Sequence, residues 1–303
     1  MSLPEPVATV TSLKSRRRPA AALGVALRPR QWSKNLLLFA GIVFAAEIGD
    51  PRKWLQAGAA FLLYCAASSA AYLLNDLVDA PADRLHPVKR RRPLARGELS
   101  RGTAALAASA LALLALVVAG SLGLVAVSFL ALFLAIQAAY TLALKHVVLV
   151  DVMAIAGLFV VRAAAGADAV DVRISPWLLV CTGLLALFLA LGKRRGELVL
   201  VGAEATPGRP VLEGYSLAFV DQLIGVVAAG AVLAYVVYTL TARDSQALAA
   251  TIPFVLFGVF RYQLLLHRAG KGEEPEDVLA TDLPILATVT VWAATSAAIL
   301  VWS

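Results

Sequence analysis

Nine long apolar stretches, separated by shorter polar segments, limit what this chain can fold into more than any other feature. Each is close to the roughly 20 mostly apolar residues that an α-helix needs to cross a bilayer. The chain is 60% hydrophobic and 16% charged, whereas soluble domains are about 45–50% apolar and about 25% charged. We therefore predict an all-α integral membrane protein with nine transmembrane helices, at 31–49, 56–79, 102–119, 122–143, 147–166, 176–192, 216–240, 248–266 and 283–302.

The domain organisation is simple because no linker long enough to separate two domains lies between these stretches. We expect one transmembrane domain over 28–303. Residues 1–27 contain several prolines and a run of basic residues at 14–18, which favours a disordered basic tail on the cytoplasmic side. The sequence leaves the oligomeric state open, including a homo-oligomer.

Positive charge is distributed unevenly between the two sides of the predicted bundle. With a cytoplasmic N-terminus, the inner segments hold 22 of the 27 Lys and Arg residues, the outer segments hold four, and Arg162 lies within a span. Such a bias is the positive-inside signal. It predicts a multi-pass protein of a bacterial plasma membrane, with the N-terminus and the functional face cytoplasmic and the C-terminus outside. The expected partner of this charge is the bilayer and its phosphates, not nucleic acid.

Three aspartates mark the inner end of the second predicted span. Asp76, Asp79 and Asp83 follow Asn75 at spacings of three and four residues. At 100° per residue they project from one side of a helix, and carboxylates in such an arrangement suit a hard divalent cation. Pro81 can kink the helix here. The alternative is a solvated helix end, which three acids in a chain this poor in acids make less favourable.

Basic residues lie next to these aspartates and on three other inner segments. Lys89, Arg90 and Arg92 either contact anionic lipid headgroups or form a phosphate cradle. Lys193, Arg194 and Glu197 begin a second inner segment, where a structural Lys193–Glu197 salt bridge competes with a binding role. Two further basic candidates are Arg261, at the inner end of a span, and Lys34, which is either an interfacial anchor or faces a cavity.

Charged residues inside the apolar stretches also indicate function, because charge in a membrane is costly. Asp151, Arg162 and Asp221 fall within predicted spans, and Lys145 lies at a span end near Tyr140. Asp151 and Arg162 are 11 residues apart, so they cannot pair along one helix. We expect each to face the bundle interior. Arg162 either reaches a substrate phosphate or pairs with another span.

The acidic motif resembles that of the UbiA-type superfamily of integral-membrane prenyltransferases. Asn75, Asp76, Asp79 and Asp83 match the first aspartate motif of that family in content, spacing and position after the second span, and the similarity runs from about residue 28 to the end. The resemblance implies a helical bundle around a central cavity, cytoplasmic cap loops, and Mg²⁺ held by Asp76, Asp79 and Asp83 against a diphosphate.

The sequence departs from most of that family after the sixth span. A second acidic motif is usual there, whereas residues 193–197 are basic with a single acid. Together with the segments 28–35, 140–146, 162–166 and 274–277, this resembles a phosphoribosyltransferase branch. That branch moves 5-phosphoribose from phosphoribosyl pyrophosphate (PRPP) to decaprenyl phosphate, which gives decaprenylphosphoryl-5-phosphoribose for cell-wall arabinan.

The resemblance assigns Asp76, Asp79 and Asp83 as catalytic and metal-binding residues. The expected substrate-binding residues share a polar side chain at or near the inner face, and are Lys34, Asn75, Lys89, Arg90, Arg92, Tyr140, Lys145, Arg162, Lys193, Arg194, Glu197 and Arg261. A substrate pair with several phosphates needs many cations, which agrees with the basic segment at 193–197.

Two other functions compete with this hypothesis. A prenyl-diphosphate transferase that acts on an aromatic or quinone-precursor acceptor would share the first motif, but it predicts a second acidic pair near residue 197. A transporter would use Asp151, Arg162 and Asp221 as a polar path through the membrane. The concentration of charge at one face favours an enzyme at the interface.

Overall fold

The computed structural model describes residues 17–44, 47–86, 88–173, 175–201, 210–241, 245–268, 278 and 281–302. In these ranges every regular element is helical. The order is α1 (Pro19–Ala26), η1 (Pro29–Phe39), α2 (Ala40–Phe44), α3 (Pro51–Leu85), η2 (Lys89–Arg91), α4 (Arg101–Leu122), α5 (Leu124–Leu142), η3 (Leu144–His146), α6 (Val150–Ala169), α7 (Pro176–Val201), η4 (Pro210–Gly214), α8 (Leu217–Thr241), η5 (Gln246–Thr251), α9 (Ile252–His267) and α11 (Leu283–Trp302), where η denotes a 3₁₀-helix.

Eight helical segments in these ranges are long and apolar enough to cross a membrane: Pro51–Leu85, Arg101–Leu122, Leu124–Leu142, Val150–Ala169, Pro176–Val199, Leu217–Thr241, Gln246–His267 and Leu283–Val301. They coincide with eight of the nine predicted spans. The all-helical, multi-pass prediction is therefore confirmed. The remaining predicted span, the first membrane helix over 31–49, is not confirmed, because the structure has different elements there.

The segment predicted as the first membrane helix is instead an 11-residue 3₁₀-helix, η1, continued by the five-residue α2. Its sequence explains the difference, because Arg30, Lys34 and Asn35 interrupt the apolar pattern on the first turns. Asn35 is fully buried. The Asn35 side chain faces α6, where its Oδ1 accepts a hydrogen bond from Arg162.

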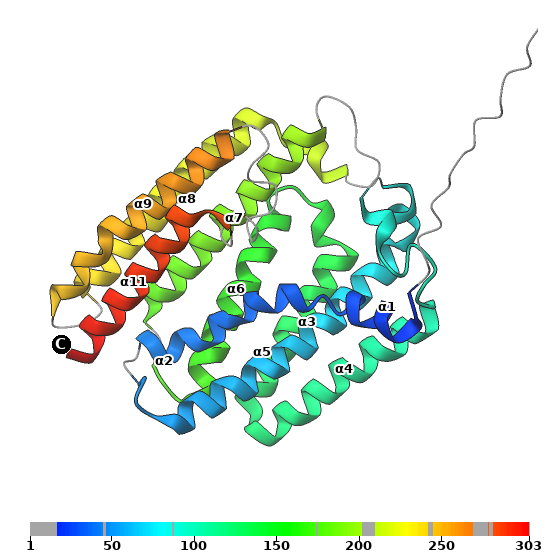
Figure 1. Cartoon of the computed structure of the whole chain (residues 1–303), viewed down its shortest axis with the longest axis horizontal. Coiled ribbons are helices and arrows are strands. Elements are labelled where there is room, and N and C mark those ends of the chain that lie inside the picture. The colour runs from blue at the N-terminus through cyan, green and yellow to red at the C-terminus, as the bar shows by residue number, and fades with distance from the viewer. Residues whose placement is uncertain are drawn as a thin grey trace, which may run out of the picture.

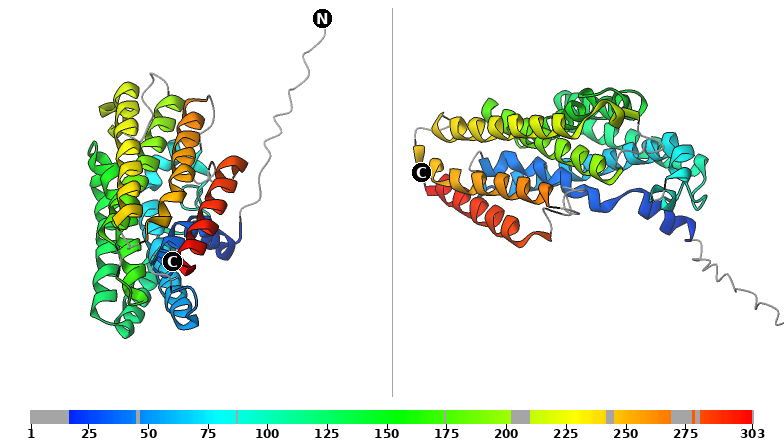
Figure 2. Two further views of the ribbon diagram at one scale, coloured as in Figure 1. Left: turned by 90° about the vertical axis from the view of Figure 1, so that its left-hand side faces the viewer. Right: turned by 90° about the horizontal axis from the view of Figure 1, so that it is seen from above.

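Each of the helices α3 to α9 packs against the next one in the chain, and α3 also packs on α5 and α6 (Figure 1). The N-terminal segment η1–α2 crosses these helices and packs on α3 and α6, and α2 also meets α11. Figure 2 shows the blue N-terminal segment and the red helix α11 on the same side of the molecule. The chain therefore covers the middle helices with its two ends.

Two glycines allow the crossing. A Cβ on Gly166 of α6 would lie 2.6 Å from the Leu38 Cα of η1, and a Cβ on Gly41 of α2 would lie 2.9 Å from the Ala167 Cα. Both distances are far below an ordinary contact, so η1–α2 and α6 meet backbone to backbone. Such small-residue contacts are typical of helices packed in a membrane.

Local signals fix the helix starts. The Asp50 side chain accepts a hydrogen bond from the Arg52 N–H at 2.8 Å, with Pro51 as the first residue of α3. Ser100 caps α4 by accepting from Thr103 N–H at 3.0 Å, and caps of this kind favour the helix start. Helix α3 continues through Pro81 to Leu85, so the aspartates lie on one unbroken helix.

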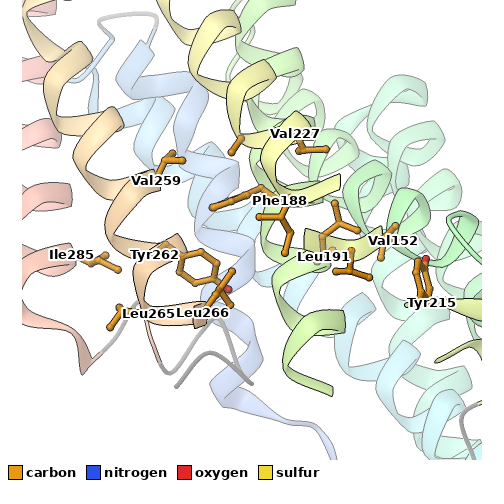
Figure 3. Close-up of a cluster of buried hydrophobic side chains, with 14 of the residues drawn as sticks. Val152, Phe188, Leu191, Tyr215, Val227, Val259, Tyr262, Leu265, Leu266 and Ile285 are labelled. Carbon is orange, nitrogen blue, oxygen red and sulfur yellow. The ribbon is translucent and has the colours of Figure 1, made fainter. Parts of the chain in front are cut away.

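The largest buried apolar cluster joins α6, α7, α8, α9 and α11. Figure 3 shows it, with Phe188 and Leu191 of α7 between Val152 of α6 and Tyr262 of α9. The rings of Phe188 and Tyr262 meet edge to face, with centroids 5.3 Å apart. This packing sets where α7 presents its polar C-terminal turns.

The predicted disordered tail is wrong for part of its length. Residues 19–26 form α1, whose Ala22 and Ala26 are buried against Leu73 and Ala80 of α3. Residues 1–16 lie outside the described residues, as do 202–209 and 269–277 of the expected cap loops. The predicted cap loops and central cavity therefore stay predictions.

Candidate active site

Asp76 and Asp83 converge on one arginine. Both side chains are buried, two helical turns apart on α3. The Arg92 Nη1 donates to Asp83 Oδ2 at 2.7 Å and to Asp76 Oδ1 at 3.3 Å. Arg28, which lies between α1 and η1, also donates to Asp76 Oδ1. The two carboxylates thus face one shared position between them, which the Arg92 guanidinium occupies.

Asp79 is turned aside from this pair and has a different cation. Its Oδ1 accepts a hydrogen bond from Lys145 Nζ at 2.5 Å. Lys145 belongs to η3, the short turn between α5 and α6. Asn75 is half-buried beside Asp76 on α3. Each of the three predicted aspartates therefore has a basic neighbour from another element.

A second cluster is built around Arg194 of α7, whose side chain is 2% exposed. Its Nε donates to Asp151 Oδ2 at 2.6 Å, its Nη1 to Glu197 Oε2 at 2.5 Å, and its Nη2 to the Tyr140 hydroxyl at 3.4 Å. The Tyr215 hydroxyl donates to the other Asp151 oxygen at 2.6 Å. One buried cation thus faces two carboxylates.

Tyr215 stays a hydrogen-bond donor in this cluster. Burial raises the pKa of its phenol above the ordinary value, and the hydrogen bond to Asp151 raises it further. The Tyr215 oxygen also accepts from the Leu149 N–H at 2.7 Å, which ties η4 and the loop that follows it to the start of α6. The cluster therefore fixes the chain around Arg194.

The two clusters lie at the same end of the bundle. Tyr140 ends α5 and contacts Arg194, and Lys145 follows five residues later and contacts Asp79. The short η3 turn thus connects the aspartates of α3 with the polar turns of α7. Predicted residues from four elements meet at this end of the bundle.

Arg162 lies apart from both clusters. Its Nε donates to Asn35 Oδ1 at 2.8 Å and its Nη1 to the Leu158 carbonyl at 3.1 Å. The guanidinium also lies over the ring of Phe133, 4.6 Å from the centroid. Of the two predicted uses, the structure provides the contact with another segment, since Asn35 belongs to η1.

Arg261 is also placed elsewhere. It donates from Nη2 to Asp282 Oδ2 at 2.9 Å and from Nε to Oδ1 at 3.2 Å, which joins α9 to the start of α11. Of the other predicted residues, Lys34 lies on η1, Lys193 is half-buried on α7, Lys89 is half-buried on η2, and Arg90 of η2 is exposed.

Sequence reasoning did not assign three residues of these clusters to the site: Arg28, Asp151 and Tyr215. Asp151 had a usable signal, because a carboxylate inside an apolar stretch needs a partner. Arg28 begins the segment 28–35 that carries part of the resemblance, but only Lys34 of that segment was assigned to the site. Tyr215 carried no signal, since its contact with Asp151 depends on how the chain returns from α7 to α8.

The carboxylates fit a divalent cation only in part as they stand. Across the described residues no three His, Cys, Asp or Glu side chains are close enough together to hold a metal ion. Asp76 and Asp83 do converge on a shared cation position, and carboxylate oxygens are the donors that Mg²⁺ prefers. A metal with phosphate oxygens as its further ligands thus fits this pair once Arg92 has moved.

Paired carboxylates and several cations thus lie together at one end of a bundle of long apolar helices. Comparison with known proteins shows which family has this arrangement. Residues 36–276 match the UbiA prenyltransferase family, so the chain belongs to that family and is a multi-pass membrane transferase. The resemblance inferred from residues 75–83 is confirmed.

Individual relatives narrow the comparison. The chain is similar to the decaprenyl-phosphate phosphoribosyltransferase of Mycolicibacterium smegmatis, with 33% identity covering 92% of each protein. The protein of that name from Mycobacterium tuberculosis is 32% identical, over 89% of this chain and 91% of the relative. A UbiA homologue from Archaeoglobus fulgidus, bound to GPP and Mg²⁺, has the same fold, with a TM-score of 0.71 at 18% identity over 92% of this chain and 99% of that one.

Proposed function

We propose that this protein transfers 5-phosphoribose from PRPP to a polyprenyl phosphate, with decaprenyl phosphate as the expected acceptor and diphosphate as the leaving group. The observation that carries the proposal is the pairing of two unlike clusters at one end of the bundle. One cluster has the converging carboxylates Asp76 and Asp83. The other has the buried Arg194, at the place where an enzyme that binds a prenyl diphosphate would have a second acidic motif. Identity with the phosphoribosyltransferases over most of the chain supports it.

Asp76 and Asp83 are the proposed ligands of Mg²⁺, and Asp79 joins them if Lys145 releases it. Bound there, the metal would neutralise charge that develops on the departing diphosphate. Asn75 lies beside Asp76 and can donate a hydrogen bond to a diphosphate oxygen. The UbiA homologue solved with GPP and Mg²⁺ supports a metal in proteins of this fold.

The basic residues divide the phosphates of the two substrates among them. PRPP carries a diphosphate and a 5-phosphate, and the acceptor carries one phosphate. Arg92 and Lys145 already contact the aspartates, so they are placed for the diphosphate. The other proposed phosphate-binding residues are Lys34, Lys89, Arg90 and Lys193, while Tyr140, Arg194 and Glu197 shape the wall next to them. Arg162 and Arg261 are assigned to positioning of η1 and α11 instead.

The chemistry requires positioning more than proton transfer. The acceptor phosphate oxygen is already anionic, so it can attack C1 of the ribose without a strong general base. The C1–O bond to the diphosphate breaks as the new C1–O bond forms on the opposite face, which inverts the configuration at C1. Cations around the diphosphate stabilise the charge it gains.

The proposed setting is a bacterial plasma membrane, with the clusters at the cytoplasmic face. The positive-inside bias supports this orientation, and PRPP is a soluble, highly charged donor that would reach the site from the cytoplasm. The acceptor would enter from the bilayer. Residues from about 28 onward form the catalytic unit in this proposal.

Transfer of labelled phosphoribose tests the function. Purified protein in lipid nanodiscs is given labelled PRPP, decaprenyl phosphate and Mg²⁺. We expect label in the lipid fraction, its loss with EDTA, and its loss in Asp76→Ala. Transfer that persists after both changes would remove the proposed roles of the metal and Asp76, and no transfer in the complete mixture would remove the function.

The same preparation tests the alternative acceptor class. Decaprenyl diphosphate and an aromatic acid such as 4-hydroxybenzoate are supplied in place of PRPP and decaprenyl phosphate. We expect no prenylated product, because the segment 193–197 lacks the second acidic pair. A prenylated aromatic product would establish the alternative.

A further inference from the structure

The two arginine clusters differ in how accessible their cations are. The Arg194 side chain is 2% exposed and is held by two carboxylates. By contrast, the side chains of Arg28 and Arg92 are 24% and 23% exposed, whereas their partner Asp76 is 1% exposed. Arg194 is therefore part of the packed interior. Arg28 and Arg92 cover buried carboxylates from the accessible side.

Arg28 is held in this place by its backbone. It adopts a left-handed conformation, with φ at 53°, which is uncommon for residues other than glycine and carries a cost. This conformation makes the turn between α1 and η1. Its guanidinium lies 4.9 Å from the ring centroid of Tyr72, one turn before Asp76 on α3. The guanidinium thus contacts the Tyr72 ring and the Asp76 carboxylate at the same time, and the ring contact does not depend on the carboxylate.

The charges of this cluster balance as they stand. Asp76 and Asp83 carry two negative charges, and Arg28 and Arg92 carry two positive charges. A divalent cation that entered alone would add two charges to a partly buried site and would have to displace the guanidiniums from the carboxylates. A diphosphate that entered with the metal would bring negative charge for the displaced guanidiniums to pair with. Like charges crowded in a low-dielectric site repel strongly.

We propose that Arg28 and Arg92 are exchangeable counter-ions, which leave Asp76 and Asp83 for the diphosphate oxygens when a divalent cation takes the carboxylates. This inference rests on the proposed function, since it concerns the same site. Arg28 thereby becomes a substrate-binding residue, and binding of metal and diphosphate becomes mutually dependent. Because such coupling is reciprocal, each ligand raises the affinity of the other by the same factor.

Manganese binding measures this coupling without any transfer reaction. Full-length protein in nanodiscs is titrated with Mn²⁺, and free Mn²⁺ is followed by electron paramagnetic resonance. Titrations are run alone and with methylenediphosphonate, with the affinity of that compound for Mn²⁺ in solution measured separately. We expect the compound to tighten Mn²⁺ binding by about tenfold or more, within the range usual for coupled sites.

Variants assign the coupling to the two arginines. In Arg28→Gln and Arg92→Gln one competing cation is gone, so Mn²⁺ alone should bind about tenfold more tightly and the effect of methylenediphosphonate should shrink. Arg28→Lys and Arg92→Lys keep the charge and should stay near wild type. Arg84→Gln is the matched control, because Arg84 is exposed at the same end of α3. Thermal unfolding of each variant is recorded beside the titration.

A gain in metal affinity is a result that damage to the fold would not produce. The inference is overturned if Arg28→Gln and Arg92→Gln bind Mn²⁺ no more tightly than Arg84→Gln, or if methylenediphosphonate leaves Mn²⁺ binding of the wild type unchanged. Its failure is separate from that of the proposed function. Coupling can be absent from an enzyme that still transfers phosphoribose, and coupling without transfer would leave this inference standing and remove the function.

Discussion

Arg194 donates from Nε to Asp151 Oδ2 at 2.6 Å, and both side chains are buried from solvent. The two residues come from neighbouring helices, α7 and α6, so the ion pair joins them at the polar end of the bundle. Removal of Arg194 would leave the buried Asp151 carboxylate without this cation, whereas removal of Asp151 would leave Arg194 with Glu197 as its carboxylate partner. This makes the pair a structural support for the site next to it.

Asp151→Ala should therefore destabilise the protein strongly. We expect a loss near the lower end of the range of about 3–5 kcal/mol usual for a broken buried ion pair, because Glu197 still pairs with Arg194, seen as lower thermal stability in nanodiscs. Asp221→Ala is the matched control. It breaks the ion pair between Asp221 and Arg195, in which the Asp221 side chain is 32% exposed. Such a partly exposed pair should contribute less than the fully buried one. Equal losses in the two variants would contradict the difference in burial.

Gly166→Ala tests the crossing of η1 over α6. The added methyl group would meet the backbone of Leu38, which cannot yield as a side chain can. We expect η1 to shift and transfer activity to fall by about tenfold or more, because small displacements of positioning groups are costly. Gly157→Ala on the same helix has nothing within 4 Å of the new Cβ and should behave as wild type. Normal activity in Gly166→Ala would show that the crossing does not position the site.

Lys145→Met removes the cation that contacts Asp79. We expect the KM for PRPP to rise by about tenfold or more, since hydrogen bonds to charged groups contribute about 1.5–3 kcal/mol. Lys145→Arg should retain most of the affinity. His146→Gln, at the exposed neighbouring position of η3, serves as the control in steady-state kinetics. An unchanged KM in Lys145→Met would take Lys145 out of substrate binding.

Tyr215→Phe should change how stability depends on pH. The folded protein holds the Tyr215 pKa above its ordinary value of 10.0, so the unfolded chain loses this proton first as the pH rises. The contribution of the phenol to stability is then complete below about pH 9 and falls as the pH passes 10. We expect the wild type to exceed Tyr215→Phe in unfolding free energy at pH 8, by less at pH 10.5. A difference that grows with pH would contradict this assignment.

Arg261→Gln separates the two uses of that residue. Its contacts with Asp282 join α9 and α11, so we expect slightly lower thermal stability and an unchanged KM for PRPP. Asp282→Asn should give the same pattern. A large rise in KM at unchanged stability would return Arg261 to substrate binding, as the sequence first indicated.

The sequence predicts best where the physics is local. Asp76 and Asp83 are seven residues apart, two turns on a helix, and they do share one arginine. Asp79 follows the same periodicity less closely and has its own partner, Lys145. The family and the eight long spans also follow from local pattern, because length, hydropathy and motif spacing are properties of short segments.

The choice of partners could not be read from the sequence. Arg194 pairs with Asp151 from 43 positions away, and Arg162 with Asn35 from 127 positions away. Both choices depend on which helices pack together and at what rotation. The close contact of η1 with Gly166 likewise exists only in the assembled bundle.

The 3₁₀ winding of η1 also affects the length of the N-terminal segment. A 3₁₀-helix rises about 2.0 Å per residue, against about 1.5 Å in an α-helix. The 16 residues of η1 and α2, Pro29–Phe39 and Ala40–Phe44, therefore extend about 30 Å, which equals the thickness of a typical hydrocarbon core. An α-helix would need about 20 residues for that distance. Within the described residues, η1 and α2 thus cover with fewer residues the length that a longer α-helix would need, beside the eight segments that are long and apolar enough to cross a membrane.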